Sequence, residues 1–210
     1  MRKILIILGM MVFLSSCKWG RISEVNRDYI SELNHYPKFL VSHFPSEIKS
    51  LPIVNYVIND TTNDCILYML VEKMDDGACN IQDSLNKTVL AKYVANDLNI
   101  VTIKTEGLLE WHPEKIVYYE SLNRGGGVYY PIPYFESMED YPLTKDISSG
   151  KTSSGLTDDM IIYIIDSKPG KYWKGLKPNK YMPVGWKNGY SKGICLSTKK
   201  GVLIYWFIVW

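Results

Sequence analysis

Cys17 is the residue of this 210-residue chain whose surroundings point most clearly to a chemical role. A basic start at residues 2–3 is followed by an apolar run over residues 4–14 and by two small serines directly before the cysteine. A run of this length is too short to span a bilayer as a helix, which needs about 20 residues. The order is typical of a signal peptide, which takes no part in the fold. Because a thiol is the best nucleophile available for alkylation, Cys17 is the residue of this segment best suited to covalent modification.

The segment Leu14-Ser15-Ser16-Cys17 resembles the lipobox of bacterial lipoproteins, which also have the basic start and the apolar run. The resemblance implies cleavage before Cys17, a thioether-linked diacylglycerol on its sulfur and acylation of the new amino terminus. One acyl chain anchors a protein only marginally, whereas two or three together anchor it stably. The alternative is an ordinary secretory signal with a cysteine at the cleavage point by chance.

The residues after Cys17 bear on where such a lipoprotein would be placed. They are Lys18-Trp19-Gly20-Arg21, without an adjacent aspartate and without the acidic cluster that resembles a surface-export signal in Bacteroidetes lipoproteins. The resemblance therefore implies a membrane-anchored, extracytoplasmic protein, on the periplasmic face of the outer membrane where the cell has one.

Three further cysteines, Cys65, Cys79 and Cys195, remain if Cys17 is acylated. An odd number in an oxidising compartment leaves at least one thiol free or paired between chains. Cys65 begins a predicted strand that would extend about 30 Å, so that the far end of this strand, and not Cys65, adjoins Cys79. A disulfide needs alpha carbons about 5.5 Å apart. We therefore expect three buried, unreactive thiols, with a Cys65–Cys79 bridge as the alternative.

Other motifs for catalysis or cofactor binding are incomplete. The three histidines lack the spacing of a helical zinc site. Gly150-Lys151-Thr152 lacks the preceding glycine of a phosphate loop, since Lys145 stands at that position. Cys195 falls in an apolar strand, where burial would raise its pKa and not activate it. The sequence thus predicts no catalytic residue, no metal site and no cofactor.

The unusual feature of the chain is its distribution of charge. Residues 131–167 hold seven acids and two lysines, whereas residues 168–192 hold seven lysines and no acid. Aromatic residues interleave with these lysines, as they do on surfaces that bind nucleic acids or anionic ligands. An extracytoplasmic location argues against nucleic acid, which leaves the anionic membrane surface, lipid A, an acidic glycan or an envelope protein. The residues that would carry such binding are Lys171, Trp173, Lys174, Lys177, Lys180, Trp186 and Lys187. The alternative is two solvated loop regions of opposite charge that lie against each other.

Composition limits the class of protein. With 46% apolar and 22% charged residues, the chain is typical of a globular domain and too apolar to be disordered. Without the two basic residues of the signal peptide it has 22 basic and 22 acidic residues, so that electrostatic recognition has to arise locally.

The expected elements follow from apolar periodicity and turn residues. A helical stripe covers residues 22–33, Pro45 opens a short helix, and the clearest helix begins at Asn80 with a stripe that continues to Val94. Strands are expected at residues 53–59, 65–74, 99–105, 115–121, 160–166, 193–197 and 202–210, with long loops over residues 123–154. The first two strands and the last two are expected to form hairpins, with residues 202–210 at the centre of the sheet.

These elements predict an α+β fold: an antiparallel sheet of about six or seven strands with two or three helices packed on one face. We expect a signal peptide at residues 1–16, the lipidated cysteine and a short tether at 17–20, and a single domain at 21–210. The expected function is a non-catalytic binding or assembly protein of the cell envelope, for instance an immunity or inhibitor lipoprotein. The alternative is an envelope hydrolase that acts on glycan or peptide, with its site in the loops of residues 123–155.

Overall fold

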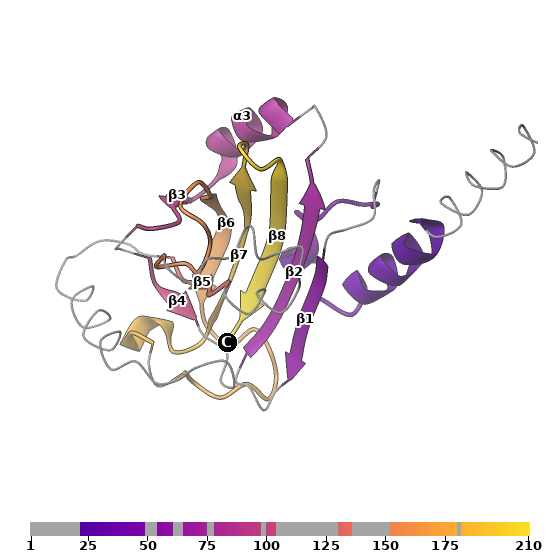
Figure 1. Ribbon diagram of the computed structural model, residues 1–210. Coiled ribbons are helices and arrows are strands. Elements are labelled where there is room, and N and C mark those ends of the chain that lie inside the picture. The colour runs from indigo at the N-terminus through magenta and orange to yellow at the C-terminus, as the bar shows by residue number, and fades with distance from the viewer. Residues whose placement is uncertain are drawn as a thin grey trace, which may run out of the picture. The chain divides into compact units, whose positions relative to one another are not determined.

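The computed structural model describes most of the chain in several stretches (Figure 1). These are residues 22–48, 54–60, 65–74, 78–97, 100–103, 130–135, 152–179 and 182–210, with the backbone alone for residues 54–60 and 78–80. Contacts within the chain divide it into two compact units, Met1–Pro52 and Ile53–Trp210. No helix in the described stretches is long and apolar enough to cross a membrane.

The first unit contains the predicted helix at residues 22–33 and a second, short helix α2 (Lys38–Val41). Tyr29 is buried, and its hydroxyl donates to the carbonyl oxygen of Pro45 at 2.6 Å, which ties the first helix to the segment after α2. The helix at residues 22–33 is confirmed. Pro37, and not Pro45, precedes the short helix, with its φ of −55° already suited to a helix start.

The second unit is built on a six-stranded sheet (Figure 1). Its order is β1-β2-β8-β7-β6-β3, and every neighbouring pair is antiparallel. The strands are β1 (Val54–Asp60), β2 (Cys65–Lys73), β3 (Ala91–Val94), β6 (Ile161–Pro169), β7 (Gly189–Ser197) and β8 (Val202–Val209). The two expected hairpins are present as β1–β2 and β7–β8, and the predicted α+β class is confirmed.

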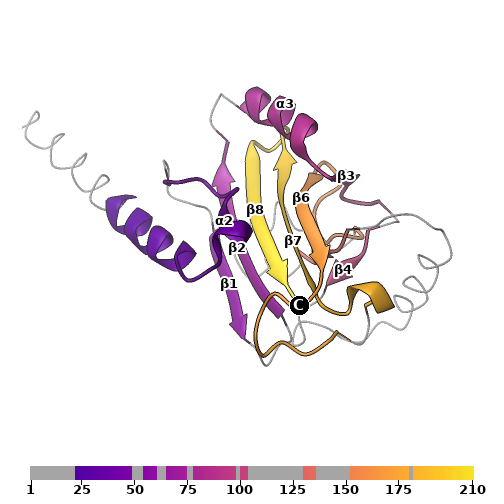
Figure 2. The same ribbon diagram turned by 180° about the vertical axis from the view of Figure 1, so that it is seen from behind.

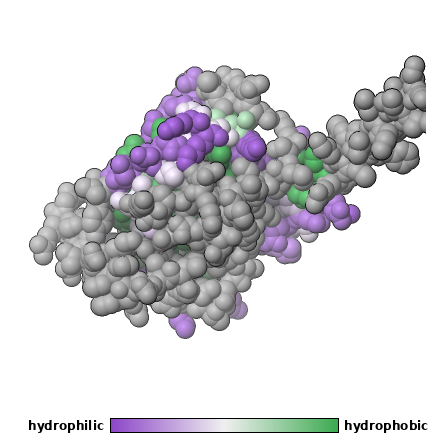
Figure 3. Space-filling view, in the orientation of Figure 1, coloured by the Kyte–Doolittle hydropathy of each residue, from purple (hydrophilic) through white to green (hydrophobic). Residues whose placement is uncertain are grey.

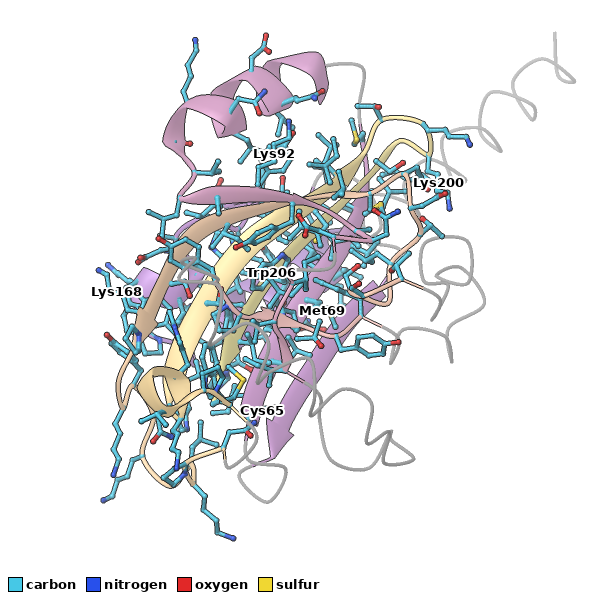
Figure 4. The ribbon with its side chains drawn as sticks, turned by 90° about the vertical axis from the view of Figure 1, so that its left-hand side faces the viewer. Cys65, Met69, Lys92, Lys168, Lys200 and Trp206 are labelled. Atoms are coloured by element: carbon cyan, nitrogen blue, oxygen red, sulfur yellow. The ribbon has the colours of Figure 1, made fainter. Side chains whose placement is uncertain are left out.

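Strand β8 lies between β2 and β7, as its continuous apolar sequence predicts (Figure 2). Successive residues of a strand point to opposite faces of the sheet. Trp206 and its neighbours two positions away, Ile204 and Ile208, therefore belong to one core cluster, together with Met69 of β2 (Figure 4). Leu203 belongs to a second cluster on the other face. Both faces of β8 are buried as a result.

Helix α3 (Ala78–Thr88) covers part of the second face, where Leu85 packs on β6, β7 and β8. The expected continuation of this helix to Val94 is wrong, because residues 91–94 form the edge strand β3. The backbone N–H of Leu90 already donates to the carbonyl oxygen of Ile164 at 2.8 Å, which begins the pairing with β6. Leu90 and Val94 are each 50% exposed. The helical stripe expected up to Val94 therefore included residues that do not lie on a common buried face.

The other face is covered by a small parallel sheet of β4 (Thr102–Ile103) and β5 (Ile132–Pro133) and by the segment that leads into β6. Ile103, Ile132, Phe135 and Met160 belong to the same core cluster as Trp206. The strand expected at residues 99–105 is thus present as a short piece. The strand expected at 115–121 and most of the loops expected at 123–154 lie outside the described residues.

Candidate binding surface

The lysine-rich region forms the end of β6, the connection to β7 and the first half of β7. The connecting loop, residues 170–188, is held to the sheet by polar contacts. The N–H of Gly170 donates to the carbonyl of Asn188 at 2.9 Å, and the N–H of Asn179 donates to the carbonyl of Lys187 at 2.7 Å. The side-chain amide of Asn188 also donates to the carbonyl of Trp210 at 3.2 Å. The two halves of this lysine loop are therefore bonded to each other and to the end of β8.

Trp186 fixes the loop from the apolar side. It lies in a short 3-10 helix, η3 (Val184–Trp186), and its ring stacks on Trp210 with 6.0 Å between ring centroids. Its carbonyl oxygen accepts a hydrogen bond from the indole Nε1 of Trp210 at 2.6 Å. The ring also packs against the core cluster. Of the two tryptophans assigned to binding from sequence, Trp186 is thus engaged in packing, while Trp173 is half-buried.

The loop lysines project into solvent. Four of those assigned to binding are exposed, as is Lys168 at the end of β6, and Lys180 lies outside the described residues. The one ion pair that this group makes with another described residue joins Lys168 Nζ to Asp166 Oδ1 at 3.9 Å. The four exposed lysines of the predicted site are Lys171, Lys174, Lys177 and Lys187. Small groups of hydrophilic atoms are visible at the lower edge of the space-filling view (Figure 3).

Lys192 differs from these lysines because it is only 6% exposed. It stands in β7 beside Phe207 of β8, and burial lowers the pKa of its ammonium group. The charge of Asp166 acts in the opposite direction and favours the protonated form, while Lys168 lowers the pKa further. This lysine belongs to the interior of the sheet face and not to the exposed surface.

Asp166, from the acidic region of residues 131–167, contacts residues of the lysine-rich region of residues 168–192. A shift of strand register between Ile164 and Asp166 places its carboxylate on the side of Tyr190, whose hydroxyl donates to Oδ2 at 2.5 Å. The ring of Tyr172 meets that of Tyr190 edge to face at 4.5 Å between centroids. Burial raises the pKa of Tyr190 above its ordinary value of 10.0, and the Asp166 carboxylate raises it further.

This environment makes a prediction for Tyr190→Phe. At neutral pH the loss of a hydrogen bond to a charged acceptor should lower the free energy of unfolding by about 1.5–3 kcal/mol. Because the pKa of Tyr190 is raised on folding, the unfolded chain loses this proton first, and the native state loses stability as pH rises above 10. We expect urea unfolding to show a smaller alkaline loss in Tyr190→Phe than in the wild type.

Some alkaline loss should remain in that variant, since burial also raises the pKa of Tyr205, to about 12. An equal alkaline loss in the variant and the wild type would contradict the environment assigned to Tyr190.

A second polar cluster lies at the other end of β7, around the turn into β8. Ser197 Oγ donates to the Asp159 carboxylate, whose other oxygen is 3.6 Å from Lys200 Nζ. Burial tends to raise the pKa of Asp159, but hydrogen bonds from Ser197 and Thr157 and the charge of Lys200 lower it overall. Ser197 is fully buried and also accepts the N–H of Lys200 at 3.0 Å. The cluster therefore closes a turn, and its serine is inaccessible to a substrate.

The thiols that the structure describes are also enclosed. Cys65 and Cys195 are free and buried, and burial raises the pKa of the Cys195 thiol well above its ordinary value. The side chain of Cys79 and all of Cys17 lie outside the described residues, so the predicted lipidation stays a prediction.

The loops proposed as a hydrolase site are described only from residue 130 to 135 and from residue 152 onward. There, the buried Ser154 donates to the carbonyl of Ala95 at 2.9 Å and so serves the packing of the core. Within the described stretches, no three His, Cys, Asp or Glu side chains are grouped so that they could hold a metal ion.

Comparisons with known proteins give no relative. No family model matches the chain, and neither the curated proteins nor the solved structures contain a significant match. The surface therefore has to be interpreted from its own residues. Sequence reasoning overlooked Val184, which is 86% exposed at the start of η3. Its position between Pro183 and Gly185, in a region rich in lysine, was the available signal.

Proposed function

We propose that this chain is a lipid-anchored protein of the cell envelope that binds an anionic partner through the lysine loop and has no catalytic role. The observation that carries the binding role is the accumulation of exposed lysines on a loop that is bonded to itself and to the sheet. Such charges are already placed before a partner arrives, so that binding costs little further ordering of the backbone.

Among the described residues, few acids compensate the charges of the loop. Three of the seven acids of the neighbouring region are described, and one of them, Asp159, is paired with Lys200 at the far end of the sheet. Asp158 is exposed, and only Asp166 meets the basic group. Figure 4 shows Lys168 and Lys200 at opposite ends of the sheet. The described acids thus neutralise a small part of the positive charge around the loop.

The proposed anchor acts together with this surface. If Cys17 carries the lipid, only residues 18–21 separate it from the first described helix. A tether of this length would hold the protein at the membrane surface and raise the local concentration of any partner there. Intact-mass analysis of the protein from its own membranes tests the anchor. The expected product begins at Cys17 and carries the mass of a diacylglycerol and an amide-linked acyl chain, and an unprocessed start would refute the proposal.

The binding role is tested by the triple variant Lys171→Glu, Lys174→Glu, Lys177→Glu. Lysines near an anionic membrane contribute about 1 kcal/mol each, so three reversals should weaken binding at least about 100-fold. The assay is cosedimentation of the chain from residue 18, which lacks the acylation site, with envelope membranes of the native cell. The residues removed are the expected signal peptide and Cys17, and a signal peptide takes no part in the mature fold.

A matched control has the same change of net charge elsewhere. Lys73, Lys87 and Lys199 are exposed and belong to β2, to α3 and to the turn between β7 and β8. Reversal of these three charges should leave binding close to that of the wild type. Equal losses in the two triple variants would show that total charge, and not the lysine loop, governs binding.

A further inference from the structure

Val184 is the most exposed large apolar side chain among the described residues, at 86%. It lies at the start of η3, and a Cβ added at the next residue, Gly185, would meet no atom within 4 Å. The turn therefore points an apolar side chain into open space, although burial of that side chain would be favourable.

The turn that presents Val184 is built firmly. Pro183 precedes η3 with a φ of −51°, and its carbonyl accepts the N–H of Trp186 at 2.7 Å. Trp186 is in turn held by Trp210 through ring stacking and a hydrogen bond. Val184 and Gly185 thus form the outer side of a turn whose inner side belongs to the core. Because the conformation of this turn is already fixed, contact of Val184 with a partner would cost little further ordering of the backbone.

Exposed lysines lie on the same loop as this apolar tip. Lys187 follows η3 directly and is bonded through its carbonyl to Asn179, while the carbonyl of Lys177 accepts the side-chain amide of Asn188 at 3.5 Å. The long stems of lysines allow their ammonium groups to stay at a polar level while a shorter apolar side chain goes deeper. An apolar tip on a loop with several exposed cations fits a partner that has anions outside and hydrocarbon inside.

We propose that the lysine loop docks on an anionic phospholipid surface, with Val184 inserted among the acyl chains and the lysines at the phosphates. This inference deepens the proposed function and rests on it, because it names the anionic partner. A soluble polyanion or an acidic glycan would satisfy the lysines but leave Val184 in water. A bilayer satisfies both groups, and it is the surface to which the proposed lipid anchor would bring the loop.

The test uses the lipidated protein in nanodiscs and a fluorophore at the tip. Gly185→Cys places a thiol where there is open space, in a Cys79→Ser background, while Cys65 and Cys195 are buried away from reagents. The thiol is labelled with an environment-sensitive nitrobenzoxadiazole dye. In nanodiscs that contain phosphatidylglycerol, the emission should shift to the blue and be quenched by brominated acyl chains. In nanodiscs of phosphatidylcholine alone, the shift should be largely absent.

Three variants and one control make the result specific. Val184→Asp should reduce the inserted fraction of the dye at least about tenfold, and each reversal of Lys174 or Lys177 about fivefold. The same dye at Lys199→Cys, in the exposed turn at the other end of β7, should stay aqueous in both kinds of nanodisc.

The outcomes separate this inference from the proposed function. If the dye at residue 185 stays aqueous in anionic nanodiscs while the lysine reversals still weaken envelope binding, the loop binds a protein or glycan, and the membrane inference is overturned. If the dye stays aqueous and the lysine reversals change nothing, both proposals fail. Insertion that is insensitive to Val184→Asp would also overturn the inference.

Discussion

Replacing Gly193 with alanine is expected to destabilise the sheet strongly. A Cβ at this position would lie 2.1 Å from the backbone carbonyl oxygen of Tyr163 and 2.7 Å from the indole of Trp206. Overpacking of a core commonly costs about 1–3 kcal/mol, and here a backbone atom of the neighbouring strand would have to move. We expect a loss at or above the upper end of this range, measured as the free energy of unfolding in urea. Domains of this size are stable by only about 5–15 kcal/mol.

Two controls distinguish this cause from a general intolerance of larger residues. Gly185→Ala adds a Cβ in open space and should change the free energy of unfolding by less than about 0.5 kcal/mol. Trp206→Phe added to Gly193→Ala relieves the contact with the indole but not the contact with the Tyr163 carbonyl, so it should fail to restore stability. Wild-type stability of Gly193→Ala would contradict the close approach of β6 and β7.

Trp210→Ala is expected to destabilise the protein and to free the lysine loop. The side chain is 1% exposed, stacks on Trp186 and donates its indole N–H to the carbonyl of that residue. Truncation of a buried tryptophan typically costs about 3–5 kcal/mol. Because the same ring holds η3, the variant should also be cut by trypsin within residues 171–187 under conditions in which the wild-type loop is protected.

Limited proteolysis with mass analysis of the fragments provides this measurement. Trp210→Phe retains an aromatic ring but lacks the hydrogen bond, so it should lose less stability and show intermediate cleavage. Val184→Ala is the control, since it changes an exposed side chain of the same turn and should leave both properties unaltered. Equal protection of the loop in Trp210→Ala and wild type would show that Trp210 does not hold the loop.

The hairpins could be predicted from sequence because each is local. Residues 202–210 are apolar at nearly every position, a pattern that requires burial on both faces, and β8 has this place in the sheet. The polar turn residues between the runs mark where each hairpin reverses. These signals depend only on neighbours in the chain.

The end of α3 could not be predicted in this way. Residues 89–94 have apolar spacing that suits a helix as well as a strand, and the choice depends on a partner far along the chain. The open edge of β6 offers hydrogen bonds to residues 91–94, and Tyr93 then reaches the core on the face opposite to Leu85. Tertiary pairing therefore overrode the local pattern.

For the lysines too, some properties follow from the local sequence and others only from the tertiary structure. Sequence alone placed seven of them close together without a neighbouring acid, because charge depends only on residue type. It could not show that Lys192 is buried, since burial depends on the strand face and on the neighbour Phe207. Nor could it predict that Val184 is exposed, because this exposure depends on the packing of Trp186 against Trp210.

The sequence by itself determined the α+β class, the helix at residues 22–33, the two hairpins, the uneven distribution of charge and the expectation of a lipid on Cys17. These are properties of composition and short-range pattern. Only the tertiary structure decided which lysines face solvent, that the loop which carries them is bonded to the sheet, and that an apolar residue stands at its tip. Such features arise from contacts between segments distant in sequence, whose energies no local pattern contains.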